Sequence, residues 1–501
     1  MPRNLVRAFL SILGTKIGVL FLAILTTPII VRLLGSDGYG DYALVMSVFG
    51  VLSVFTTSGI FNGIRKYIAE DRSFNCWSDH VFAFYFKVSV LVTGGFALFL
   101  ILLSQTRLVE ESLSSEFQLY FLILAAYLFL DQFYSVGRGA LMGFGLEHHS
   151  EPLKIVKKLI YAITAIALLY FGLGVEGVLL GQVTAALIVG VTTLWLIRER
   201  ISFAQVFRRS HSIPKYELLS FNVYSILLAF LTISLYHVDI LILRPVAGNV
   251  ETGYYKAALV IAEFLWMAPM AIQYTLVHST SEMWSKGQHE TITEIASRST
   301  RLNLSLMVIM MIGLAALANT FVPIYFGSEF YPAVVPLLIL LPGVLGFALA
   351  RPIFAIGQGK GELRSLVLAT GAAAVLNLCL NLLLIPSYGM IGAALATSIG
   401  YASMFLFHTL IARRIGFDPI ADLRAIRIFA AGLLTAPVVF GLAEVLTPLF
   451  SLVVVPIVGF MLYFALSVQL GVISTDELKM VHQKAPSKFD PIFKWIFAFK
   501  G

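Results

Sequence analysis

The segment RLLGSDGYGDYALV, from Arg32 to Val45, decides how this chain folds, because a looser copy of it returns in the second half. The later copy reads RPVAGNVETGYYKAALV and runs from Arg244 to Val260. In both copies a long apolar run ends at an arginine, a short Gly-rich turn follows, and a glycine with tyrosines opens the next apolar run. Gly-rich turns between apolar runs indicate a change of chain direction, so we infer that one hairpin is used twice.

Two further pairs of matches lie at nearly the same spacing as the hairpins. The stretch GVEGVLLGQV, from Gly174 to Val183, corresponds to GMIGAALATS, from Gly389 to Ser398. An arginine before a Gly-rich turn also occurs twice, at Arg138 and at Arg351. Internal repeats of this length indicate a transporter built from two lobes.

The composition places the chain in a membrane. Hydrophobic residues make up 58% of it and charged residues only 13%, whereas about a quarter of an average globular chain is charged. The sequence holds about fourteen apolar runs of roughly 20 residues, which are long enough to cross the hydrocarbon layer as helices. We therefore predict an all-α polytopic membrane protein.

The repeat divides these runs into six, six and two. We predict an N-terminal lobe, a C-terminal lobe, two extra spans and a basic amphipathic cytoplasmic tail, over residues 1–205, 206–418, 419–471 and 472–501. The first apolar run is too long for a cleaved signal peptide and is read as the first span. Cys76 and Cys379 lie far apart in the chain, so neither a disulfide framework nor a thiolate metal site is expected.

The positions of the 35 lysines and arginines predict the orientation. With the N-terminus inside, the outer loops hold only four of them, namely Arg32, Arg107, Arg244 and Lys256. The positive-inside rule then places both termini on the cytoplasmic side of the cytoplasmic membrane. The net charge of +7 follows mostly from this topology, so it calls for no nucleic-acid partner, and the remainder would hold anionic membrane lipids.

The length of the connections between spans distinguishes a transporter from a membrane enzyme. The longest outer loop, from Gln105 to Glu116, is too small for the extramembrane domain that membrane glycan polymerases and ligases need. The inner connection from Arg198 to Lys215 is basic, with apolar residues on one side of a short helix (Phe203, Val206 and Phe207). This pattern, like that of the tail from Lys488 to Lys500, is typical of a segment lying on the inner leaflet.

Charged residues inside the first six spans are few. Each costs about 2.5–3.5 kcal/mol in hydrocarbon and therefore normally faces protein or water. Lys16 and Lys87 either extend to the cytoplasmic surface or face a cavity. Asp131 is either the structural partner of a neighbouring cation or a group that carries a proton.

The second repeat holds a set of oxygen donors. Asp239 lies in the seventh span, Asn377 and Asn381 share one face of the eleventh, and Thr397 lies in the twelfth. These donors would suit a small cation such as sodium, although hydrogen bonds between helices would also account for them. Glu263 in the eighth span is a further candidate for carrying a proton.

The opening segments PIIVRLLGSDGYGDYALV and SGIFNGIRKYIAE resemble the polysaccharide-flippase branch of the multidrug/oligosaccharidyl-lipid/polysaccharide exporter superfamily. The resemblance extends over essentially the whole chain. It implies a flippase, not an enzyme, that moves a lipid-linked sugar or oligosaccharide by alternating access. The carrier would be undecaprenyl diphosphate or dolichyl phosphate, and glycosyltransferases of the same pathway would be partners.

The resemblance also implies site residues. In related lipid II flippases the seventh, eleventh and twelfth spans hold a sodium ion, which matches Asp239, Asn377, Asn381 and Thr397, although Asn381 replaces a carboxylate. Coupling to sodium or to protons remains open, with Asp131 and Glu263 as proton candidates. Cations that meet the phosphate headgroup would be Lys16, Arg65, Arg138 and Arg351. Arg65 and Arg351 would equally fit as ordinary positive-inside residues.

Three other functions compete with the flippase. A cation-coupled exporter of drugs or metabolites from the same superfamily would have an acidic, aromatic cavity, whereas these spans offer cations. A membrane glycan polymerase or ligase conflicts with the short outer loops. The major facilitator architecture lacks support, because its Gly/Asp/Arg signature is missing from RKYIAEDRSFNCWSDH after the second span.

Overall fold

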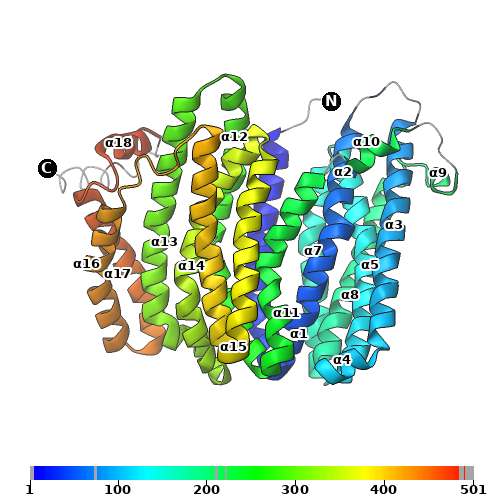
Figure 1. Ribbon diagram of the computed structural model, residues 1–501, viewed down its shortest axis with the longest axis horizontal. Coiled ribbons are helices and arrows are strands. Elements are labelled where there is room, and N and C mark those ends of the chain that lie inside the picture. Colours follow the sequence, from blue (N-terminus) through cyan, green and yellow to red (C-terminus); the bar gives the residue numbers. More distant parts are fainter. Residues whose placement is uncertain are drawn as a thin grey trace. The chain divides into compact units, whose positions relative to one another are not determined.

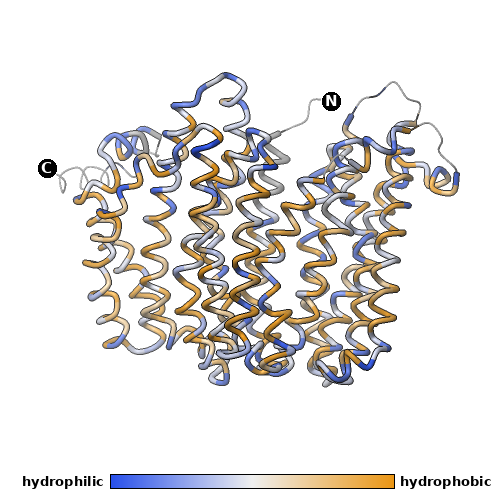
Figure 2. The backbone as a smooth tube through the Cα atoms, viewed as in Figure 1, coloured by the Kyte–Doolittle hydropathy of each residue, from blue (hydrophilic) through white to orange (hydrophobic). Residues whose placement is uncertain are grey.

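The computed structural model describes residues 5–70, 72, 76–208, 213–220, 223–484 and 490. Within these ranges the regular elements are all helices, and ten of them are long and apolar enough to span a membrane. The helices are apolar along their length and hydrophilic at their ends (Figure 2). The predicted all-α polytopic fold is confirmed.

Three of the ten helices bend sharply at a glycine. Gly35 in α1 (Leu5–Ser53), Gly248 in α11 (Val223–Phe264) and Gly389 in α15 (Leu363–Ile415) have φ of 70°, 86° and 50°. Only glycine adopts such angles without strain. Each bend makes a hairpin of two spans, and α7 adds a span with three lysines, so about fourteen spans result, as the sequence predicted.

The remaining elements follow in chain order (Figure 1). They are a π-helical turn η1 (Val54–Ser58), α2 (Gly59–Ala69), α3 (Trp77–Ser104), α4 (Arg107–Ser112), α5 (Glu116–Gly143), α6 (Glu147–Ser150), α7 (Pro152–Tyr170), α8 (Gly174–Ile197), α9 (Ala204–Phe207), α10 (Lys215–Ser220), α12 (Met267–Ser285), α13 (His289–Phe326), the 3-10 turn η2 (Ser328–Ala333), α14 (Val334–Lys360), α16 (Ala425–Val445), α17 (Pro448–Gln469) and α18 (Thr475–Lys484).

The chain forms two compact units. Unit 1 comprises residues 1–256 and 378–393, and unit 2 comprises residues 257–377 and 394–501. In unit 1, α5 packs against α2, α3 and α8, while α7 packs against α1 and α8. In unit 2, α14 packs between α12 and α13, and the two extra spans, α16 and α17, pack on α13.

The inner connection of unit 1 is docked onto protein. Phe203 and Val206 pack against a core cluster of α2, α3 and α5, whereas Phe207 is 90% exposed. The hydroxyl groups of Tyr67 and Tyr85 donate to the carbonyls of Glu217 and Leu218 in α10. The three apolar residues therefore do not share one membrane-facing side. The predicted interfacial segment of the tail, from Lys488 to Lys500, lies outside the described residues apart from Asp490.

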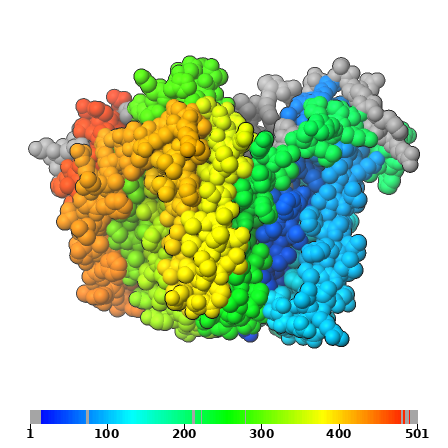
Figure 3. Space-filling model, in the orientation of Figure 1, coloured from blue at the N-terminus to red at the C-terminus, as the bar shows by residue number. Residues whose placement is uncertain are grey.

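Unit 2 holds its extra spans through an ion-pair cluster. The buried guanidinium of Arg301 in α13 pairs with Asp422 before α16 and with Glu477 in α18. Arg298 binds the same Glu477 carboxylate at 2.9 Å. α16 exposes several large apolar side chains, among them Ile426, Phe429 and Leu433, as a lipid-facing helix should. Its atoms, orange by their place in the chain, lie at the surface in Figure 3.

The two glycine hairpins of α1 and α11 meet inside unit 1. A Cβ placed on Gly40 would lie 1.9 Å from the carbonyl oxygen of Asn249, and a Cβ on Gly253 would lie 1.9 Å from that of Ser36. Gly40 stands five residues after Gly35, as Gly253 does after Gly248. The contact is therefore reciprocal, which is the geometry of a twofold axis relating two copies.

Candidate functional site

Cationic side chains gather in unit 1 around Glu151, which precedes α7 and has a side chain that is 1% exposed. Arg138 of α5 binds one of its carboxylate oxygens at 2.9 Å, and Lys154 binds the other at 2.7 Å. Lys16 of α1 is exposed and interacts electrostatically with Glu151 and Lys154. Two of the predicted headgroup residues, Lys16 and Arg138, thus lie near one carboxylate.

A third predicted residue joins this group through an aromatic ring. The guanidinium of Arg138 lies over Phe61 at 4.6 Å from its centre, and that of Arg65 lies at 5.7 Å from the same ring. Arg65 is exposed, so it also retains the character of an ordinary positive-inside residue.

The lysines of α7 were not selected from the sequence. Lys157 forms an ion pair with Asp131, and its ammonium lies 4.7 Å from the centre of the Tyr134 ring. Asp131 therefore has a neighbouring cation as its partner. The signal in the sequence was the segment PLKIVKKLIYAI, in which lysines open an apolar run. We refer to Lys16, Arg65, Arg138, Lys154 and Lys157, with Asp131 and Glu151, as the cationic cluster.

The ion pairs leave this cluster with an excess of positive charge. Its seven named side chains include five cations and two carboxylates. Burial raises the pKa of Glu151, but the hydrogen bonds from Lys154 and Arg138 outweigh burial, so its pKa lies below the ordinary value. Glu151 therefore stays ionised at neutral pH and holds two cations in place.

The remaining predicted cations are located elsewhere. Arg351 belongs to unit 2, where it is 6% exposed, lies over the ring of Phe347 at 3.8 Å and donates to Gln273 at 3.5 Å. Arg351 is therefore buried, whereas an ordinary positive-inside arginine at the end of a span is exposed. Lys87 extends to the inner connection, where its ammonium donates to the carbonyl of Arg208 at 2.7 Å.

The predicted oxygen donors are all buried but divided between the units. Asp239 and Asn381 belong to unit 1, and Asn377 and Thr397 belong to unit 2. The amide of Asn377 donates to the carbonyl of Ala396 at 3.2 Å. Their common cation site therefore remains a prediction. Within the described part of the chain, no three His, Cys, Asp or Glu side chains form a metal-binding group.

Asp239 has a well-defined hydrogen-bonding environment. Its carboxylate accepts the hydroxyl hydrogen of Tyr255 and, at 2.7 Å, the backbone N–H of Ile240. Tyr255 lies beyond the bend at Gly248, so this bond joins the two arms of the second hairpin. Glu263, near the end of α11, is half-buried in unit 2.

The first hairpin has no carboxylate at the matching position. When Gly35 is aligned with Gly248, Asp239 corresponds to Thr26, whose hydroxyl donates to the carbonyl of Leu22 at 2.8 Å. The hairpin therefore forms without an acid at this position, and Asp239 is a special feature of the second copy.

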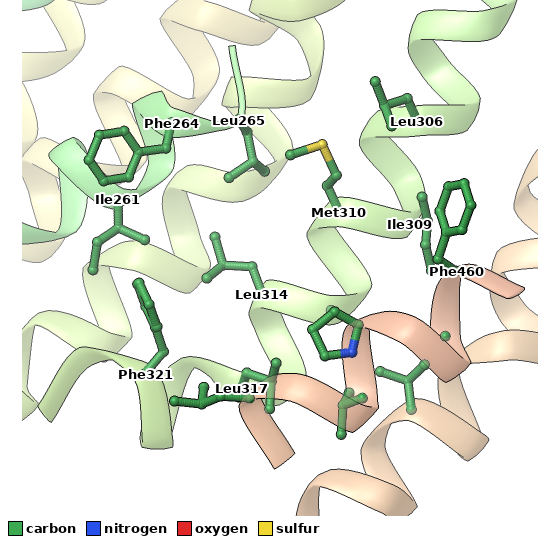
Figure 4. Close-up of a pocket in the computed structure, with 16 residues that line it drawn as sticks. Ile261, Phe264, Leu265, Leu306, Ile309, Met310, Leu314, Leu317, Phe321 and Phe460 are labelled. Carbon is green, nitrogen blue, oxygen red and sulfur yellow. The ribbon is translucent and has the colours of Figure 1, made fainter. Parts of the chain in front are cut away.

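Unit 2 contains an apolar cavity of about 460 Å³. Leu306, Ile309, Met310 and Leu314 of α13 line one side, and Phe460 of α17 lines another (Figure 4). No charged residue contributes to its lining. Such a cavity suits a hydrocarbon chain, because apolar walls offer a polar ligand no partner.

A family model described as polysaccharide biosynthesis protein matches residues 5–277, which is more than half of the chain. The chain belongs to the polysaccharide biosynthesis protein family. A relative from Haloferax volcanii, named a probable low-salt glycan biosynthesis flippase, is 23% identical over 75% of this chain and 77% of its own. An uncharacterized membrane protein from Methanocaldococcus jannaschii is 24% identical over 89% of this chain and 91% of its own.

A solved structure of the lipid II flippase MurJ in an inward closed conformation has the same fold. It covers 91% of this chain and 98% of its own length with a TM-score of 0.75, at 14% identity. The predicted relationship to polysaccharide flippases is thus confirmed at the level of family and fold.

Proposed function

We propose that this protein translocates a sugar or oligosaccharide linked to a polyprenyl phosphate or diphosphate across the cytoplasmic membrane. Translocation proceeds by alternating access, with both termini on the cytoplasmic side. No covalent chemistry is assigned to the protein. The product serves the assembly of surface polysaccharide or glycoprotein.

The cationic cluster carries this proposal. Phosphate is recognised by guanidinium and ammonium groups held in fixed positions, and Glu151 fixes Arg138 and Lys154 at hydrogen-bonding distance. The excess of cations over carboxylates supplies charge for a phosphate or diphosphate. In our proposal Lys16, Arg65, Arg138 and Lys157 meet the phosphate, and Arg351 of unit 2 contributes a further cation.

In our proposal the apolar cavity of unit 2 binds part of the lipid chain of the substrate. Its volume of about 460 Å³ accommodates only part of a polyprenyl chain. A polyprenyl chain would enter this cavity from lipid and not from water, so van der Waals packing against the apolar walls, and not the hydrophobic effect, would hold a few isoprene units there. The rest of the chain would remain in the bilayer.

We propose coupling to sodium or to protons at Asp239. The chemistry of the donor set, one carboxylate with Asn377, Asn381 and Thr397, fits sodium, which prefers hard oxygen ligands. Asp239 would supply the charge, and Tyr255 would orient its carboxylate. For proton coupling, Asp131 and Glu263 are the other carriers we consider.

The proposal is tested by the location of lipid-linked glycan in cells without this protein. Intact cells and inverted membrane vesicles would be compared for the leaflet that exposes the glycan. We expect complete lipid-linked glycan to accumulate on the cytoplasmic leaflet. Glycan that reaches the outer leaflet but remains unpolymerised or untransferred would instead support an enzyme, and an unchanged distribution would support an exporter of other solutes.

Variants connect this result to the cationic cluster. The double substitution Arg138→Gln with Lys157→Gln should fail to restore the outward distribution, because losing hydrogen bonds to a charged group weakens binding about 10- to 100-fold per bond. Arg72→Gln is the matched control, since Arg72 also lies in unit 1 but pairs with Glu70 and Glu217. Full restoration by the double variant would remove the cluster from the headgroup site.

A further inference from the structure

A second cavity, of about 650 Å³, opens in unit 1 at the end that is predicted to face outward. It lies among the turns of both glycine hairpins, the segment between α4 and α5, and the start of α8. Its lining includes Asp37, Asp41, Glu116, Tyr120, Arg244 and Asn249. Its volume lies in the range of about 300–1,000 Å³ that is common for small-molecule sites. We refer to it as the outer pocket.

The charge of the outer pocket is opposite to that of the cationic cluster. Arg244 is 7% exposed, and its Nε donates to Asp41 at 2.6 Å, so this pair is neutral overall. Asp37 and Glu116 are both exposed. The pocket therefore carries net negative charge and repels a phosphate.

Tyr120 offers the outer pocket a hydrogen-bonding group on a largely buried ring. The residue is 7% exposed and lines the pocket, with its ring 5.2 Å from the Phe117 ring. Among the described residues, no hydrogen-bond partner is found for its hydroxyl group. The hydroxyl group is accessible from the pocket, and a polar ligand bound there would supply a hydrogen-bond partner for it.

The polar groups of the pocket include both donors and acceptors. Asp37 and Glu116 only accept, the guanidinium of Arg244 only donates, and Tyr120 does either. A single cation would use the acceptors alone, and the described residues include no metal-binding group of His, Cys, Asp or Glu. A sugar hydroxyl both donates and accepts, so a neutral polyhydroxyl ligand uses the whole set.

We propose that the outer pocket binds the sugar part of the glycan through its hydroxyl groups. This inference rests on the proposed function for the identity of the ligand. The cationic cluster holds the phosphate end, while the acidic outer pocket accepts sugar and excludes phosphate. The two ends of one substrate are thus recognised by sites of opposite charge in the same unit.

The experiment uses the purified full-length protein and free sugars, so that no lipid carrier is needed. Leu113 lines the pocket, and Leu113→Cys would be labelled by a thiol reagent in a background in which the two exposed native cysteines, Cys76 and Cys379, are replaced by serine. The probes are maltose, mannobiose and chitobiose, with inorganic pyrophosphate and sodium chloride for comparison. We expect at least one disaccharide, and neither salt, to slow the labelling.

Substitutions in the pocket give the second measurement. Tyr120→Phe and Glu116→Gln should each raise, about tenfold, the disaccharide concentration that gives half of the maximal protection from labelling. Each substitution removes one hydrogen bond or one charge. Glu110→Gln, an exposed glutamate of α4 outside the lining, should leave this concentration unchanged. Saturation-transfer NMR with the same disaccharides would check each variant without the introduced cysteine.

Several results would overturn the proposal. Protection by pyrophosphate or sodium instead of sugars would assign the pocket to an anion or a cation. No binding of any of the three disaccharides, or equal binding by Tyr120→Phe and wild type, would also refute it. The proposed function is judged separately: normal flipping of lipid-linked glycan without sugar binding would remove only the outer pocket, and sugar binding without a flipping defect would remove only the flippase.

Discussion

At the scale of single residues, Glu151 organises the cationic cluster. Its carboxylate is buried and forms ion pairs with Arg138 and Lys154. The sequence pattern pointed to Arg138 but not to this acid. The reason is that a glutamate just before a span is unremarkable in the sequence, and only the packing of both α5 and α7 on α8 reveals its role. The same arrangement accounts for Lys157, which reaches Asp131 from α7.

Glu151 leads to a prediction about pH. Its folded-state pKa is lowered by its two cationic partners, so it stabilises the fold above its unfolded pKa of about 4.3, and this contribution is lost as the pH falls through the folded value. Glu151→Gln should therefore lower the free energy of unfolding by about 1–3 kcal/mol at pH 7. Thermal unfolding at several pH values should show wild type and variant converging below about pH 4. A difference in stability between wild type and variant that persists in acid would contradict the prediction that the ionised carboxylate of Glu151 is the stabilising form.

At the scale of elements, the sequence predicted the hairpins well but not their register. The Gly-rich turns were correctly located, because glycine is the residue that tolerates the left-handed bend seen at Gly35 and Gly248. Matching Arg32 to Arg244, however, is off by one residue, since the bends align Arg244 with Val31. Arg244 is buried against Asp41, so its resemblance to the exposed Arg32 was only local. Long-range partners of this kind cannot be read from spacing.

The second hairpin allows a test of ion coupling. Asp239→Asn preserves size but removes the charge that a cation or a proton would neutralise, and Asn still offers an acceptor to Tyr255. We expect any sodium dependence of transport to be lost, together with sodium-dependent thermal stabilisation of the purified protein. Thr26→Val, at the matching position of the first hairpin, should leave both unchanged. Sodium dependence that survives Asp239→Asn in full would exclude Asp239 from the site.

At the scale of the whole molecule, the two repeats contact each other through backbone atoms. The hydrophobic pattern predicted two copies of six spans and two extra ones, since membrane helices are set by length and hydropathy. It gave no sign that Gly40 and Gly253 each lie against a carbonyl of the other hairpin. Glycine is needed at both positions because no side chain fits between the two hairpins. This requirement appears only when both hairpins are placed together, so neither copy reveals it alone.

This reciprocal contact supports the last prediction. Alanine at Gly40 or at Gly253 would place a Cβ 1.9 Å from a backbone oxygen, so the hairpins must separate, at a cost of about 1–3 kcal/mol typical of overpacking. Gly38→Ala meets its nearest atom only at 3.4 Å and should be neutral or stabilising, because alanine favours a helix. Thermal unfolding would measure all three. Because both substitutions open the same contact, the double variant should lose less than the sum of the single losses, whereas full additivity would show that the two glycines act independently.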